Sequence, residues 1–185
     1  MPLNFGATLE GDVAKVLHSP EELRKACQTL GAAISTDYEG KLPLVVGVLS
    51  GAAVFMSDLV RCITIPCELE FIAVSSYGKR SVSGDLHFKK DVSVDLKGRH
   101  VLIVEDIVDT GRTLKAVREA FSDRGAASFE ICSLLDKKAR RAVDVECKYV
   151  GFECPDEFVI GYGIDYAERY RNLPFVGALK REVYE

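Results

Sequence analysis

Short apolar runs alternate along this chain with stretches whose apolar residues recur at helical spacing. The run at residues 43–49 is apolar on both faces, which is typical of a strand inside a parallel sheet. Comparable runs follow at residues 101–105 and 129–135. Strands that alternate with helices of this size predict an α/β fold with a doubly wound, mostly parallel sheet flanked by helices.

The first expected helix starts at Ser19-Pro20-Glu21-Glu22, because a cap serine, a proline at the first helical position and a glutamate three residues after the cap mark a helix N-terminus. Further helices are expected at residues 52–62 and 113–121, with Gly125 closing the latter. Further strands are expected at residues 68–74, 149–152 and 158–162. Residues 76–98 show little periodicity and predict a functional or mobile loop. With no repeat and no linker, one domain spanning residues 1–185 is expected.

The composition of the chain argues against several classes of protein. The chain has 24 basic and 28 acidic residues, and its net charge of −4 argues against nucleic acid as the main partner. The six cysteines form no CxxC pair, so a zinc site is not expected. The first residues lack the pattern of a secretory signal, and the longest apolar run, residues 42–49, is too short to span a bilayer. These features predict a reduced, cytoplasmic protein without a membrane partner.

The segment VLIVEDIVDTGRTL, residues 101–114, places three acids directly after a strand and a turn directly before a helix. The turn offers backbone N–H groups and hydroxyls that suit a phosphate, whereas the acids suit sugar hydroxyls or hydrated Mg²⁺. Together they describe a ligand with a ribose in the middle and a phosphate at one end. The alternative is an acidic loop that caps a helix with solvated carboxylates. The residues concerned are Glu105, Asp106, Asp109, Thr110, Gly111, Arg112 and Thr113.

This segment resembles the phosphoribosyl pyrophosphate (PRPP) motif of type I phosphoribosyltransferases. Later stretches resemble the hypoxanthine-guanine branch of that family, namely LLDKK at residues 134–138, PDEFVIGYGIDY at 155–166 and YRNL at 170–173. The resemblance covers about residues 44–174. It implies the type I fold, with a small hood built from terminal segments and a mobile lid loop, and it implies Mg²⁺ as cofactor and a homodimer or homotetramer.

The resemblance implies roles for the residues of the PRPP motif. Asp109 would be the general base that assists proton loss from the purine, although its position also permits helix capping. Glu105 and Asp106 would bind the ribose hydroxyls near a Mg²⁺ ion. Residues 110–113 would hold the phosphate of PRPP.

Other residues would recognise the base. Lys137 would donate to O6 of hypoxanthine or guanine, and a cationic donor there penalises a 6-amino purine such as adenine. Phe158 would stack on the purine, and Val159 would contact its edge through the backbone. The alternatives are a solvated lysine and a core aromatic side chain.

A third group of residues would bind pyrophosphate. Asp165 would hold a second Mg²⁺, and Arg171 would contact pyrophosphate directly, unless both form a surface ion pair. Ser50 and Gly51 match a loop that binds pyrophosphate through backbone N–H groups, often next to a cis peptide bond. Many relatives have Lys at the position of Ser50. Ser76 and Tyr77 match the lid loop that closes over the reacting atoms.

The expected activity is transfer of the 5-phosphoribosyl group from PRPP to N9 of hypoxanthine or guanine, which yields the nucleoside monophosphate and pyrophosphate in purine salvage. A xanthine-preferring transferase is one alternative. Another is a nucleotide-sensing regulator on the same fold. The regulator would carry an added DNA-binding domain or a basic face, and the acidic net charge disfavours it.

Overall fold

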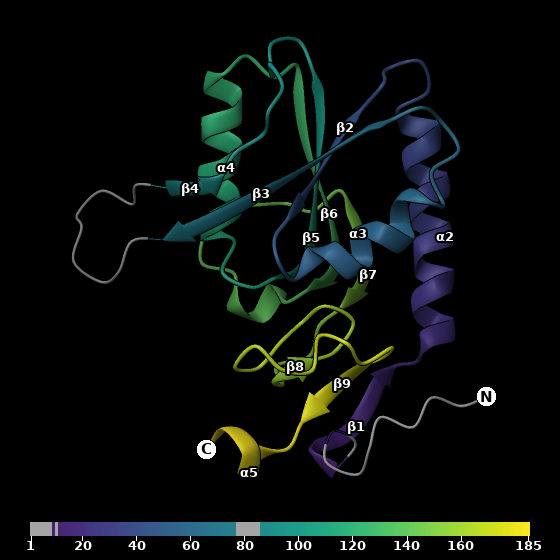
Figure 1. Ribbon diagram of the computed structural model, residues 1–185, viewed down its shortest axis with the longest axis vertical. Coiled ribbons are helices and arrows are strands. Elements are labelled where there is room, and N and C mark those ends of the chain that lie inside the picture. The colour runs from purple at the N-terminus through teal and green to yellow at the C-terminus, as the bar shows by residue number, and fades with distance from the viewer. Residues whose placement is uncertain (1–8, 10, 77–85) are drawn as a thin grey trace.

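The computed structural model describes residues 9, 11–76 and 86–185 (Figure 1). The expected α/β architecture is confirmed. The helices are α2 (Pro20–Asp37), α3 (Ala52–Val60), α4 (Arg112–Asp123) and α5 (Arg181–Tyr184), with a short 3-10 helix η1 (Lys138–Arg140). The strands are β1 (Val13–His18), β2 (Leu44–Val48), β3 (Glu68–Ser76), β4 (Leu86–Lys90), β5 (His100–Val108), β6 (Ser128–Asp136), β7 (Tyr149–Glu153), β8 (Val159–Ile160) and β9 (Val176–Leu179).

The main sheet has six strands in the order β4-β3-β2-β5-β6-β7. All neighbours pair in parallel except β4, which runs antiparallel along the edge of β3. Parallel pairing requires a crossover between consecutive strands, and the helices supply it. The carboxyl ends of β2, β5 and β6 therefore meet at one edge of the sheet, where ligands bind in open sheets of this kind.

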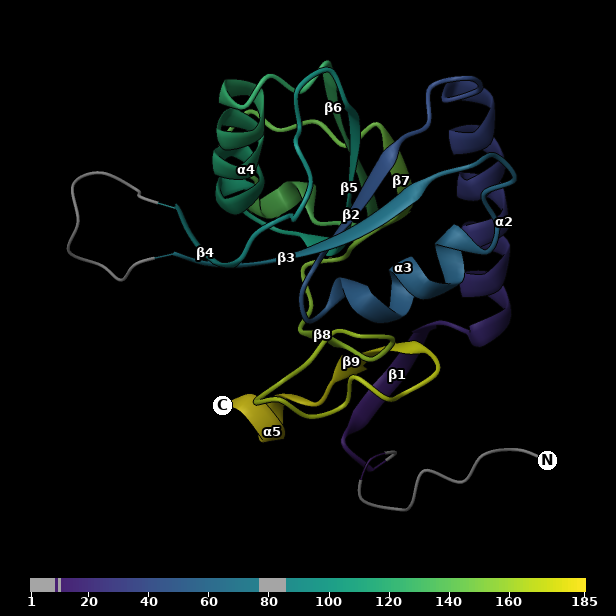
Figure 2. The same cartoon turned by 45° about the horizontal axis from the view of Figure 1, so that its top comes forward.

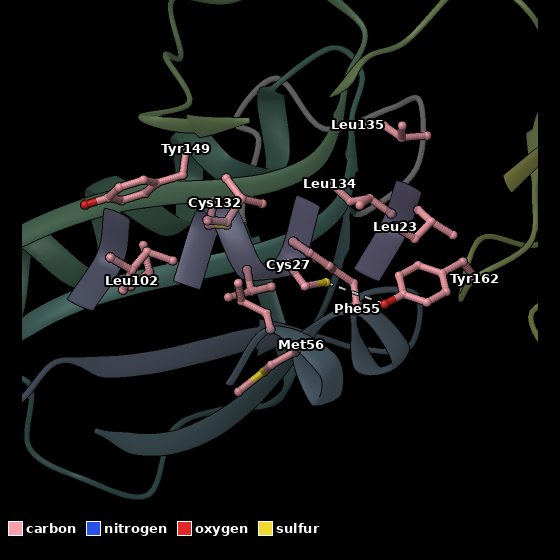
Figure 3. Close-up of a cluster of buried hydrophobic side chains, with 14 of the residues drawn as sticks. Leu23, Cys27, Phe55, Met56, Leu102, Cys132, Leu134, Leu135, Tyr149 and Tyr162 are labelled. Atoms are coloured by element: carbon pink, nitrogen blue, oxygen red, sulfur yellow. Dashed lines mark hydrogen bonds between the residues drawn. The ribbon is translucent and has the colours of Figure 1, made fainter. Parts of the chain in front are cut away.

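Helices cover both faces of the main sheet (Figures 1 and 2). Alternate residues of each strand point to opposite faces, so two core clusters form. One joins α2 and α3 to residues such as Leu102 and Cys132, and Figure 3 shows part of it. The other joins α4 to residues such as Ile103 and Ile131. The first turn of α2 carries the expected capping box between Ser19 and Glu22.

The expected hood is present as a second sheet of three antiparallel strands, in the order β1-β9-β8. It brings an early and a late segment of the chain side by side, since Val13 pairs with Leu179. The hood lies beside the carboxyl end of β2, because Gly163 contacts Gly51. It shares buried residues with the α2 and α3 cluster, including Val159, Tyr162 and Ile164.

Several local expectations were wrong. Residues 158–162 form only the two-residue strand β8, and it belongs to the hood rather than to the main sheet. Strand β4 lies within the stretch expected to be a loop. Strand β5 runs on to Val108, so Glu105 and Asp106 lie within the strand and not after it. No helix in the described part of the chain is long and apolar enough to cross a membrane.

Candidate active site

The two consecutive acids of β5 lie near the loop that follows β2. A Cβ atom built on Gly51 would lie 1.9 Å from Oδ2 of Asp106, so only a glycine leaves room for this carboxylate. Oδ1 of Asp106 accepts a hydrogen bond from the backbone N–H of Ile107 at 2.8 Å. The peptide bond between Leu49 and Ser50 is cis, as in the loop that the sequence resembles.

The ionised forms of both acids are destabilised by their surroundings when no ligand is bound. Burial raises the pKa of Glu105 well above its usual range, and the neighbouring charge of Asp106 raises it further. Burial also raises the pKa of Asp106, while backbone hydrogen bonds and Arg171 oppose this shift. Carboxylates whose burial is only partly compensated by a nearby cation favour a ligand that brings donors or positive charge.

Asp109 has an oxygen atom that lacks a partner. Its Oδ1 is buried and accepts no hydrogen bond from the residues that the structure describes. Its Oδ2 lies 3.9 Å from the guanidinium of Arg140. The alternative role as a helix cap is not realised, because the N-cap of α4 is Gly111, which has no side chain to cap with. Asp109 therefore presents one carboxylate oxygen, Oδ1, whose acceptor capacity the described residues leave unused.

The turn before α4 lines a small cavity of about 130 Å³. Gly111 has a φ of 78°, a conformation that favours glycine, and it lets the chain enter the helix directly after Thr110. The side chain of Arg112 is exposed and does not line this cavity. The lining residues are Glu105, Ile107, Val108, Asp109, Thr110, Gly111, Thr113 and Leu114. The first helical N–H groups are unpaired by nature, so this cavity suits an anion.

Arg141 supports this turn from behind and was missed by the sequence analysis. Its guanidinium forms an ion pair with the buried Asp136, and it lies against the Cα of Gly111. The backbone N–H of Ala142 also donates to the carbonyl of Thr110 at 3.0 Å. The signal in the sequence, a basic run at residues 137–141, is ambiguous because such runs are usually solvated.

Lys137 is buried, with 6% of its surface exposed, so the alternative of a solvated lysine is wrong. Its Nζ donates to the carbonyl of Glu157 at 2.8 Å and lies 3.2 Å from Oδ1 of Asp156. The hydrogen bond from Lys137 lowers the pKa of Asp156. These contacts hold the ammonium group in one orientation at the carboxyl end of β6.

Phe158 is an exposed aromatic side chain beside Lys137. It keeps 39% of its surface exposed, so it is not the core residue of the alternative reading. Its ring stacks on Tyr184 with centroids 5.0 Å apart and meets the edge of Tyr166 at 5.3 Å. Phe158 and Lys137 line one cavity of about 520 Å³. Val159 is buried in β8 and pairs with Ala178.

Asp165 and Arg171 form an ion pair, which was the alternative to their expected roles, with Nη2 of Arg171 2.9 Å from Oδ1 of Asp165. Arg171 also donates to the carbonyl of Gly163 at 2.8 Å. Gly163 lies against Gly51, which in turn lies against Asp106, so the pair lies on the side of the site where the acids of β5 lie. Ser76 ends β3, and Tyr77 lies outside the described residues.

Within the described parts of the chain, no group of three or more His, Cys, Asp or Glu side chains could hold a metal ion by itself. Mg²⁺ is usually bound by one or two carboxylates together with substrate phosphates. Asp106 and Asp165 offer carboxylates of this kind on the same side of the site.

Comparison with known proteins matches this geometry to a family. The model of the phosphoribosyl transferase domain family matches residues 13–167. A hypoxanthine-guanine phosphoribosyltransferase of Streptococcus pneumoniae (strain ATCC BAA-255 / R6) is 52% identical over 177 residues, covering 95% of this chain and 98% of the relative. The enzyme of that name from Bacillus subtilis (strain 168) is 48% identical over 178 residues, covering 96% and 99%.

Comparison with solved structures leads to the same family. The crystal structure of a hypoxanthine phosphoribosyltransferase from Staphylococcus aureus superposes with a TM-score of 0.94 at 45% sequence identity, and the match covers 98% of this chain and 100% of that one. The six-stranded sheet, its helices and the hood therefore form the type I phosphoribosyltransferase fold. The chain belongs to the hypoxanthine-guanine phosphoribosyltransferase family.

Proposed function

We propose that this chain transfers the 5-phosphoribosyl group from PRPP to N9 of hypoxanthine or guanine, giving the nucleoside monophosphate and pyrophosphate in purine salvage. The observation that carries the choice of base is the buried, oriented ammonium of Lys137 beside the exposed ring of Phe158. A fixed donor there accepts the O6 atom of a 6-oxo purine, whereas the 6-amino group of adenine would place donor against donor. The names of the similar proteins support the same choice.

In this proposal Asp109 is the general base. Its buried Oδ1 has no partner among the described residues, so it can accept the N–H of the imidazole ring while N9 attacks the sugar. Glu105 and Asp106 bind the ribose hydroxyls, and their negative charge stabilises the positive charge that develops on the sugar. The turn at residues 110–113 binds the 5′-phosphate through its N–H groups and hydroxyls.

The pyrophosphate end of PRPP would lie between the loop at Ser50 and Gly51 and the pair formed by Asp165 and Arg171. The guanidinium of Arg171 offers paired donors to phosphate oxygens. We propose that Asp106 and Asp165 help to hold Mg²⁺, with Glu105 contributing from the neighbouring position. Bound Mg²⁺ would neutralise the charge of the leaving pyrophosphate. Ser76 and Tyr77 would close over the site.

The cellular setting belongs to the same proposal. A purine salvage enzyme with free cysteines acts in a reducing cytoplasm, and the six cysteines of this chain are all free. We also propose that the chain assembles as a homodimer or homotetramer. Phe55, Met56 and Leu59 of α3 are buried in the chain's own core, and Val54 is the large apolar side chain of this helix that is exposed.

Product analysis tests the proposed reaction. Purified protein, PRPP, Mg²⁺ and hypoxanthine are incubated, and nucleotide and pyrophosphate are quantified separately. The proposal expects inosine monophosphate and pyrophosphate in equal amounts, loss of turnover with a chelator and its return with added Mg²⁺. Turnover that persists in excess chelator would refute the role of the metal, and pyrophosphate without nucleotide would refute transfer to the base.

A further inference from the structure

The turn formed by Gly161, Tyr162 and Gly163 has an unusual backbone, because all three residues have positive φ angles of 96°, 51° and 102°. A tyrosine rarely adopts this conformation, which is strained and persists only where the surroundings hold it. The backbone N–H of Tyr162 donates to the carbonyl of Leu173 at 2.9 Å. The chain therefore maintains a strained tyrosine between two glycines, shortly before Asp165 in the sequence.

The side chain of Tyr162 fastens this turn to the core. It is buried, and its hydroxyl donates to Oδ2 of Asp58 at 2.6 Å. Sγ of Cys27 lies 3.7 Å from the same hydroxyl, and Figure 3 shows this contact. A phenol has one hydrogen to donate, so the thiol of Cys27 donates to the hydroxyl oxygen while the carboxylate of Asp58 accepts from it. The bond to Asp58 connects the hood to helix α3.

The turn also supports the proposed pyrophosphate end of the site. A Cβ atom on Gly163 would lie 2.1 Å from the carbonyl oxygen of Gly51, so the turn is in direct contact with the loop that follows β2. The carbonyl of Gly163 accepts from Arg171, which pairs with Asp165. Helix α3, which carries Asp58, starts directly after Gly51. Asp58, Tyr162 and Arg171 line one cavity of about 610 Å³.

We propose that Asp58 and Tyr162 are positioning residues for the pyrophosphate end of PRPP. Their hydrogen bond fixes the turn of the hood against the loop after β2, and thereby sets the spacing between Gly51 and the pair of Asp165 and Arg171. The inference rests on the proposed function, because it assumes that pyrophosphate lies in this gap. The base cavity at Phe158 and Lys137 does not depend on the hydrogen bond, so its affinity should not change.

Tyr162→Phe removes the hydroxyl and keeps the ring. We expect the KM for PRPP to rise about tenfold, the effect of losing one hydrogen bond to a charged acceptor. The KM for hypoxanthine should change by less than about twofold. Tyr38→Phe is the matched control, because Tyr38 is also buried but its hydroxyl has no hydrogen-bond partner among the described residues. It should leave both constants unchanged.

Variants of Asp58 separate positioning from general loss of structure. Asp58→Ala removes the same bond and also the ion pair of Asp58 with Arg61, so it should raise the KM for PRPP at least as much as Tyr162→Phe, and the double variant should be no worse than Asp58→Ala. Asp58→Asn keeps an acceptor oxygen and should retain most of the PRPP affinity. An unchanged KM for PRPP in Tyr162→Phe, equal losses for both substrates, or additive single effects would each overturn the proposal.

Calorimetric titration of PRPP with Mg²⁺, without any base, distinguishes this inference from the proposed reaction. Weaker PRPP binding by Tyr162→Phe supports the positioning role whichever base the enzyme accepts. A wild-type chain that binds PRPP but transfers nothing to hypoxanthine would refute the proposed reaction alone. Equal PRPP affinity in the wild type and Tyr162→Phe would refute the positioning role alone.

Discussion

Replacing Gly51 by alanine should disable the site without unfolding the chain. The added Cβ would lie 1.9 Å from Oδ2 of Asp106, whereas real Cβ atoms essentially never come closer than 3.0 Å to such an atom. The carboxylate must therefore retreat by about 1 Å, and a misplacement of this size can cost about a hundredfold in rate. The three atoms nearest to this Cβ all belong to the Asp106 side chain, so this side chain is the group that has to move.

The cost in stability should be small. Gly51 has a φ of −62°, which alanine adopts readily. Moving Asp106 sacrifices its hydrogen bond from Ile107, worth about 1 kcal/mol, which corresponds to a fall in Tm of roughly 2–4 °C in a chain of this size.

The assay is kcat/KM for PRPP, measured by the absorbance change on nucleotide formation, together with thermal unfolding. Gly11→Ala is the control, because a Cβ at Gly11 meets nothing within 4 Å among the described residues. We expect kcat/KM to fall about a hundredfold in Gly51→Ala and to stay unchanged in the control. A folded Gly51→Ala variant with wild-type kcat/KM would show that the position of Asp106 is irrelevant to the reaction.

Three further substitutions test individual side chains. Asp109→Asn should lower kcat by about 10²–10⁴-fold while calorimetry finds PRPP affinity nearly intact; the reverse pattern would contradict its role as general base. Lys137→Met should lower kcat/KM for hypoxanthine at least about a hundredfold but leave PRPP binding unchanged, and equal losses for both substrates would point to misfolding instead. Glu105→Gln should raise the Tm of the ligand-free chain at neutral pH. Because burial raises the pKa of Glu105, the folded state holds this proton more tightly than the unfolded state, so stability is highest in acid and falls as pH rises through the folded pKa. The stabilisation by Gln should therefore shrink towards acidic pH, and a pH-independent difference in Tm would refute this cause.

The sequence predicts the PRPP motif well because the signal is local. Strand β5, its acids, the turn and α4 are consecutive, and their order alone implies where the acids and the helix N-terminus meet. The capping box at Ser19 is local as well. The length of β5 was less predictable, since pairing with β6 extends the strand past its two acids to Ile107 and Val108.

The hood and the environment of Lys137 depend on contacts between distant residues. Strands β1 and β9 pair with each other although they lie near opposite ends of the sequence. Neither has the apolar alternation of a long strand. Lys137 is buried because residues 156 and 157 fold over it, which a basic run does not reveal. Asp58 and Tyr162 lie 104 residues apart, and neither belongs to a recognisable motif with the other.

The identity of the accepted base tests the proposed reaction. Purified chain, PRPP and Mg²⁺ are mixed separately with hypoxanthine, guanine, xanthine and adenine, and nucleotide formation is followed by absorbance. We expect turnover with hypoxanthine or guanine and none with adenine, because the Lys137 donor requires a 6-oxo group. Adenine turnover comparable to that of hypoxanthine, or no turnover with any base by a chain that still binds nucleotide, would contradict it.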